Sequence, residues 1–148
     1  IDRRMATFAF EELTEEIRAG RKLPPETAFV ADIEAESLEQ AAEDDSPLGT
    51  VYVAPTLLAA LRSGTAGSAA TAILVSQVME TVLEAASKID RDADVQDGSG
   101  LARILDWASS GSDRMAWRDF HPVAASSERR RAFVQHDMRI GDILRRLK

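Results

Sequence analysis

The longest apolar segment of the chain, which runs to Ile89, constrains the fold more than any other feature. Five of its apolar residues recur at spacings of four, three, four and three: Val75, Met79, Val82, Ala86 and Ile89. This spacing is that of a helical seam. Four neighbouring apolar residues widen the seam: Ile73, Leu74, Val78 and Leu83. The pattern predicts one long helix with a broad apolar surface.

The apolar surface of such a helix can have two structural roles. Its apolar surface either fills the core of one chain, which we favour at this length, or forms the face of a homodimer. The residues of the dimer face would then be the five of the seam, Val75, Met79, Val82, Ala86 and Ile89. A third reading places Ala72–Ser76 in a strand followed by a shorter helix, since short apolar runs suit both structures.

The remaining segments predict a mixed fold. Helical spacing or helix-favouring residues occupy five further stretches: 6–19, 34–45, 56–62, 101–109 and a last helix capped by Ser126 or Ser127. Two short β-branched runs, 27–33 and 50–53, are typical of strands. The stretches 90–100 and 111–122 are expected to be irregular, and 63–71 is either a loop or a helix start. We therefore expect a helix-rich α+β domain with a two- or three-stranded sheet; an all-α bundle is the alternative.

Charge divides the chain into two unequal parts. The segment 128–148 holds seven basic and three acidic residues, a net charge of +4, whereas the other 127 residues carry −11. We expect an acidic globular body over residues 1–125. Residues 126–148 would form a basic amphipathic segment, either part of the same domain or a mobile tail.

The basic segment suggests a contact with a negatively charged partner. Its candidate contact residues are Arg129, Arg130, Arg131, Arg139, Arg145 and Arg146. These side chains suit phosphates of a nucleic acid or carboxylates of a protein partner. They also suit the acidic body of the same chain, or the C-terminal dipole of a solvated helix.

Catalytic and metal-binding patterns are weak. The alternating carboxylates of 90–94 fail as a calcium loop because Val95 and Leu101 stand where glycine and glutamate belong. Asp32 and Glu34 end a predicted strand, and with His121 or His136 they are the residues that an enzyme or ligand-binding site would use. That site would lie beside the turn at 53–55, because open sheets bind ligands at the carboxyl ends of strands. We expect no metal and no cofactor.

Composition bears on the redox compartment of the protein and on membrane association. The chain has no cysteine, so disulfides and thiolate zinc sites are excluded, and a cytoplasmic or other reducing compartment is expected. Its most apolar run, 69–75, is far shorter than the roughly 20 residues of a membrane span, so we expect no membrane association. Arg18, Arg21 and Lys22 are expected to complement the C-terminal dipole of the first helix.

These observations favour a binding protein over an enzyme. The favoured hypothesis is an adaptor or assembly factor that binds a protein partner, with a basic tail that contacts nucleic acid or an acidic partner in a larger particle. The alternative is a small α/β enzyme or regulatory ligand-binding domain that uses Asp32, Glu34 and a histidine.

Overall fold

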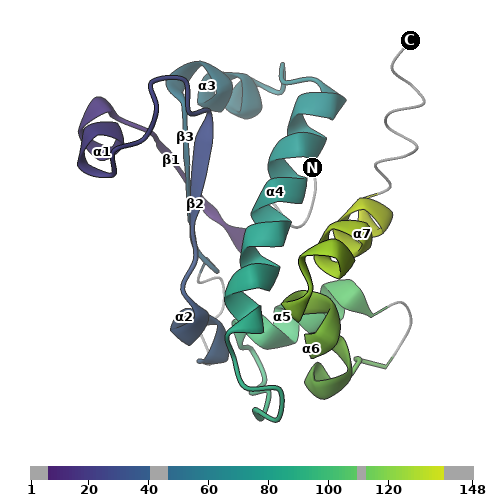
Figure 1. The fold of residues 1–148 in the computed structure, drawn as a ribbon. Helices are drawn as coiled ribbons and strands as arrows, with labels where there is room; N and C mark the ends of the chain where they lie inside the picture. The colour runs from purple at the N-terminus through teal and green to yellow at the C-terminus, as the bar shows by residue number, and fades with distance from the viewer. Residues whose placement is uncertain (1–6, 41–46, 110–112, 139–148) are drawn as a thin grey trace.

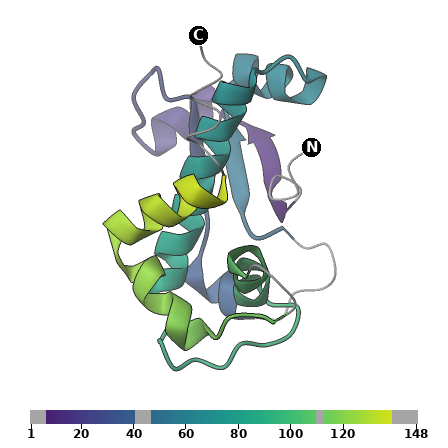
Figure 2. The ribbon, with the colours of Figure 1, turned by 90° about the vertical axis from the view of Figure 1, so that its right-hand side faces the viewer.

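A long helix, α4 (Ser68–Ser87), runs through the middle of the molecule with a small sheet on one side and helices on the other. The computed structural model describes residues 7–40, 47–109 and 113–138. Within these residues the chain forms seven helices and three strands, which confirms the expected helix-rich α+β class. Figure 2, turned by 90°, shows α7 (Ser127–Asp137) crossing α4 on the side away from the sheet.

The sheet is mixed, with strand order β1-β3-β2. The central strand β3 (Thr50–Val53) pairs in parallel with β1 (Ala9–Glu12) and antiparallel with β2 (Phe29–Asp32). Val51 and Val53 of β3 are fully buried, and Phe10, Phe29 and Ala31 of the outer strands join the same core. The predicted strands at 27–33 and 50–53 are thus confirmed.

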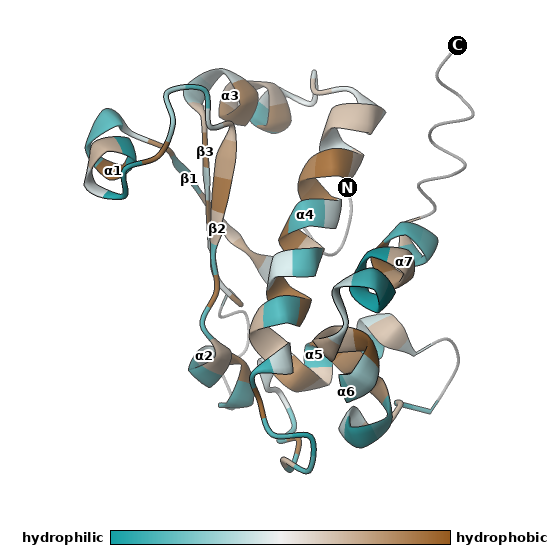
Figure 3. Ribbon diagram, viewed as in Figure 1, coloured by the Kyte–Doolittle hydropathy of each residue, from teal (hydrophilic) through white to brown (hydrophobic). Residues whose placement is uncertain are grey.

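The five seam residues form the core of a single chain, which contradicts the dimer-face alternative. Their exposed fractions are 2% or less, and they are Val75, Met79, Val82, Ala86 and Ile89. Nine of the 20 residues of α4 are buried, because the sheet, α6 and α7 surround it. Apolar colouring in Figure 3 accordingly runs along α4, the strands beside it and α5. The strand alternative for Ala72–Ser76 is also wrong.

By length and composition alone, α4 could cross a membrane. Among the described residues it is the one helix for which this is true. Half of its most apolar stretch is buried inside the fold, as in the core helix of a globular protein, so the membrane indication is weak. The apolar stretch of α4 is therefore longer than the run 69–75 from which the sequence predicted that no segment could span a membrane.

The first predicted helix, 6–19, is wrong in its first half. Residues Ala9–Glu12 form β1 instead, and helix α1 (Glu15–Gly20) begins only after Thr14, whose hydroxyl accepts a hydrogen bond from the N–H of Ile17. Pairing with β3 satisfies the backbone of this segment and overrides the helical preference of its glutamates.

Four other short helices complete the described part of the fold beside α1, α4 and α7. They are α2 (Ala35–Glu39), α3 (Pro55–Ser63), α5 (Gly100–Ala108) and α6 (Trp117–Ala125). The predictions for 56–62 and 101–109 are confirmed. The helix predicted over 34–45 is observed at Ala35–Glu39, and residues 41–45 lie outside the described residues. The expectation of irregular structure over 111–122 is wrong, because α6 occupies half of it.

Helix α6 forms despite a proline in its interior. Pro122 has no N–H, so the carbonyl of Arg118 four residues earlier loses its helical partner. The Nε of Arg91, in the loop before α5, donates to this carbonyl at 3.1 Å. Because the freed carbonyl is satisfied from outside, the helix continues to Ala125.

Candidate functional site

The described arginines of the basic segment lie on α7, and two of the three are bound within the chain. Arg131 pairs with Glu80 of α4 at 3.4 Å, and Arg130 donates to the carbonyl of Ala124. The side chain of Arg129 is exposed and has no side-chain partner among the described residues. Arg139, Arg145 and Arg146 lie outside the described residues.

Arg130 and Arg131 line a polar groove between α4 and α7. It has a volume of about 270 Å³ and brings Glu80 and Glu84 of α4 beside Arg130 and Arg131. The carboxylates of the acidic body therefore neutralise part of the basic segment in the same chain. Arg130 and Arg131 thus have partners in the same chain, although 67% of the Arg131 side chain stays exposed, whereas Arg129 has no side-chain partner among the described residues.

The carboxylates and histidine of the alternative hypothesis are not brought together. Asp32 is paired with Thr50 in the sheet register, so it lies at the opposite end of β3 from the turn at 53–55. It faces the outer side of the sheet and pairs there with Arg21 at 3.1 Å. His121 lies across the core, where its Nε2 is 3.1 Å from the carbonyl of Ser87. His136, on α7, lies on that far side as well.

The acidic loop after α4 is held by arginines. Asp92 pairs with Arg118 at 3.7 Å, and Asp97 lies 3.8 Å from Arg114. A hydrogen bond from Arg114 to Asp106 raises the pKa of that guanidinium above its usual value. Among the described residues no group of three or more potential ligands is arranged to hold a metal ion. These carboxylates therefore support loop structure.

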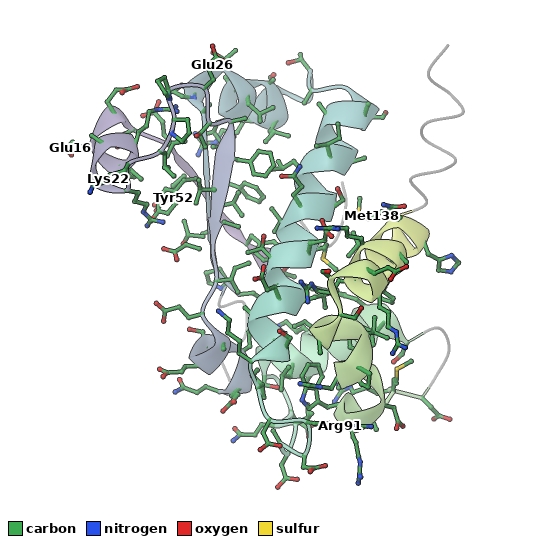
Figure 4. The ribbon with its side chains drawn as sticks, in the orientation of Figure 1. Glu16, Lys22, Glu26, Tyr52, Arg91 and Met138 are labelled. Carbon is green, nitrogen blue, oxygen red and sulfur yellow. The ribbon has the colours of Figure 1, made fainter. Side chains whose placement is uncertain are left out.

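A different groove combines concavity with a buried charge. We name it the Arg18 groove; its volume is about 500 Å³ and its lining is mainly apolar. Three parts of the chain form it: Arg18 with residues 25–28, the start of α3 (Ala54, Thr56, Leu57 and Ala60), and Ala66 with Ala70 near the start of α4. In Figure 4, Glu26 marks its outer edge, beside α3 and pointing away from the molecule.

The groove lies where two parallel strands end. Ala54 directly follows β3, and the N–H of Leu13, the residue after β1, donates to the carbonyl of Val53 at 2.8 Å. The carboxyl ends of β1 and β3 therefore share this edge of the sheet. This is the edge at which sequence reasoning expected a ligand, although with other residues than Asp32 and Glu34.

Arg18 is the buried charge of the groove, with only 9% of its surface exposed. Its Nη1 donates to the carbonyls of Pro24, at 2.8 Å, and Thr27, at 3.3 Å. Its Nε has no hydrogen-bond partner, although the exposed carboxylate of Glu15 lies 3.5 Å away as an ion pair. Arg18 therefore ties down the loop before β2, and its buried Nε makes no hydrogen bond.

The first turn of α3 supplies further polar groups to the groove. Its N-cap residue, Ala54, has no side chain that can accept a hydrogen bond from the helix. Pro55 has no N–H, so the amides of Thr56 and Leu57 are the uncapped donors of this turn. An uncapped helix start carries partial positive charge. A buried guanidinium and this helix start thus border one apolar groove.

Sequence reasoning missed the role of Arg18, because it assigned this residue to a helix dipole. One pattern points to it in retrospect. Pro24 and Pro25 offer two carbonyl acceptors but no N–H donor, so a loop that contains them needs donors from elsewhere. An arginine six residues before Pro24 can supply them.

Another groove is larger, at about 700 Å³, but has a polar lining. It lies on the other side of α3, where Glu11, Glu12 and Arg62 are all exposed. Exposed charges of both signs are already solvated, so this surface has less to gain from a ligand. The Arg18 groove is therefore the stronger candidate site.

No protein-family model, no curated protein and no solved structure matches this chain.

Proposed function

We propose that this protein is a ligand-binding domain that takes a small molecule in the Arg18 groove. The observation that carries the proposal is the combination of an apolar groove of about 500 Å³ with one buried arginine, whose Nε makes no hydrogen bond. Small-molecule sites in proteins typically have this size, an apolar lining and a few convergent polar groups. The location at the carboxyl ends of β1 and β3 supports the same function.

Two exposed alanines allow a test of this proposal. Ala70 lines the groove from α4, so Ala70→Trp places an indole in it without disturbing the core. Ala59 is exposed on α3 but lines the other groove, so Ala59→Trp is the matched control. The measurement is saturation-transfer NMR with a set of small acids, amines, alcohols and amides.

We expect at least one chemical class to bind the native protein and Ala59→Trp but not Ala70→Trp. If every class that binds is unaffected by Ala70→Trp, or if none binds, the groove is not a ligand site. The control separates blocking of the groove from a general effect of a surface tryptophan.

A second candidate function is the adaptor that the sequence favoured. The observation that favours it is the exposed side chain of Arg129 on α7, which belongs in sequence to the basic segment 128–148. Fluorescence anisotropy with single- and double-stranded RNA and DNA at two salt concentrations tests its nucleic-acid contact. Binding that weakens steeply with salt and with Arg129→Glu supports the contact; absent or salt-independent binding removes it. Retention of an acidic protein partner on immobilised native chain but not on Arg129→Glu would support the protein contact.

A further inference from the structure

We propose that the ligand of the Arg18 groove is a small aliphatic monocarboxylate. This inference rests on the proposed function and names its ligand class. The carboxylate would bind the guanidinium of Arg18 and the amides of the first turn of α3, and the aliphatic part would lie on the alanine and leucine side chains of the groove. Three features of the groove lead to this chemistry.

The first feature is the sign and geometry of the charge. A guanidinium presents five N–H donors in a planar fork that suits a carboxylate. In Arg18 only Nη1 has hydrogen-bond partners among the described residues, and both are neutral carbonyls. The one carboxylate that pairs with Arg18 among the described residues, that of the exposed Glu15, makes no hydrogen bond with it, so this buried cation has electrostatic stabilisation to gain from a better placed anion.

The second feature limits the anion to one negative charge. Among the described residues Arg18 is the one basic residue that lines the groove, and Glu26 lines it as well, with an exposed side chain. A second negative charge on the ligand would meet the carboxylate of Glu26 and no second cation. Phosphates and dicarboxylates are therefore less suited than a monocarboxylate.

The third feature is the shape and chemistry of the lining. The apolar part of the groove consists of short aliphatic side chains, among them Ala28, Leu57, Ala60 and Ala66. No aromatic residue of the described part of the chain lines it, so a planar ring would find no partner for stacking there. An alkyl chain instead gains affinity with each methylene that it buries.

Glu15 already pairs with the cation that the ligand would bind. Its side chain is 91% exposed, and its carboxylate is the one that pairs with Arg18, at 3.5 Å from Nε. This ion pair lacks hydrogen-bond geometry, as the unpartnered Nε shows. Glu15 therefore competes with the carboxylate of a ligand for the same cation, and its removal should strengthen binding.

The test compares octanoate with octanamide, its neutral counterpart of nearly equal size, by isothermal titration calorimetry on the whole chain. We expect octanoate to bind more tightly, and Glu15→Gln to raise its affinity up to about fivefold, as for loss of one competing surface charge. Glu15 is exposed, so this variant does not depend on core packing. Arg18→Gln should abolish the difference between octanoate and octanamide.

Other outcomes would overturn the inference. These are equal affinities for octanoate and octanamide, an unchanged or lower octanoate affinity in Glu15→Gln, or octanoate binding that persists in Ala70→Trp. Preference for a peptide with a free carboxyl terminus, with no binding of octanoate, would also overturn it. A different result is needed to overturn the proposed function. It fails only if no class of small molecule loses its binding in Ala70→Trp.

Discussion

At the scale of single residues, this fold depends on long side chains that satisfy backbone carbonyls. Arg18 binds the carbonyls of Pro24 and Thr27, and Arg91 binds the carbonyl of Arg118. In both cases a proline lies at or near the acceptor, and proline supplies no donor of its own. These arginines are therefore structural in part, in a chain where arginine greatly outnumbers lysine.

Arg91→Met tests this role. The variant keeps the length of the side chain but leaves the carbonyl of Arg118 to water, so we expect a loss of about 0.5–1.5 kcal/mol in the free energy of unfolding. Arg62→Met, at an exposed position of α3, removes the same charge and serves as the control. Equal losses in the two variants, measured by urea denaturation, would show that the hydrogen bond contributes nothing.

A second residue-scale prediction concerns Lys22, which adopts φ of 54° in the loop after α1. Side chains with a Cβ are strained in this left-handed region, and glycine is not. We therefore expect Lys22→Gly to leave the free energy of unfolding unchanged or to raise it by up to about 1 kcal/mol. Lys88→Gly, at a right-handed position after α4, should lower it. The prediction is wrong if both variants are destabilised equally.

At the scale of elements, helix starts decide where the chain turns. Ser126 accepts a hydrogen bond from the N–H of Arg129 and so begins α7 directly after α6. Phe133 of α7 then packs edge-to-face on Phe120 of α6, with ring centroids 5.1 Å apart. A cap in the sequence thus fixes the position of an aromatic contact between two helices.

Ser126→Ala should lower the free energy of unfolding by about 0.5–2 kcal/mol, because the first turn of α7 loses its cap. Ser127→Ala, one residue later and exposed, changes no cap and should have a small effect. Thermal unfolding followed by circular dichroism compares the two. A reversed order of stability would contradict this assignment of the cap.

Elements were predictable from the sequence where a local pattern and a tertiary contact agree. The strand Thr50–Val53 and the helices α3 and α5 meet this condition, since their apolar residues face the core at the expected period. Residues 9–12 and α6 do not. The first forms a strand only because β3 is beside it, and the second tolerates Pro122 only because Arg91 is near.

The candidate site was less predictable than the fold. Its edge of the sheet was expected from the turn at 53–55, but its charged residue was not. Arg18 becomes buried only when the loop before β2 folds over it, and no pattern in the sequence gives the path of that loop. Asp32, in turn, was expected near the turn at 53–55 because β2 was not known to run antiparallel to β3.

At the scale of the whole molecule, α4 is a core helix rather than an interface. Met79→Ala should therefore lower the free energy of unfolding by about 2–5 kcal/mol, because it leaves a cavity. The loss should not depend on protein concentration. A melting temperature that rises with concentration in the native protein and not in Met79→Ala would indicate a dimer instead.

The location of the ligand site is the central claim, and one measurement tests it most directly. Backbone amide shifts in two-dimensional NMR, followed during titration with octanoate, report which residues lie near the ligand. We predict changes concentrated at Arg18, Ala28, Thr56 and Leu57, and lost in Ala70→Trp. Changes centred on α7 or on the outer face of the sheet, or none at saturating octanoate, would contradict the account.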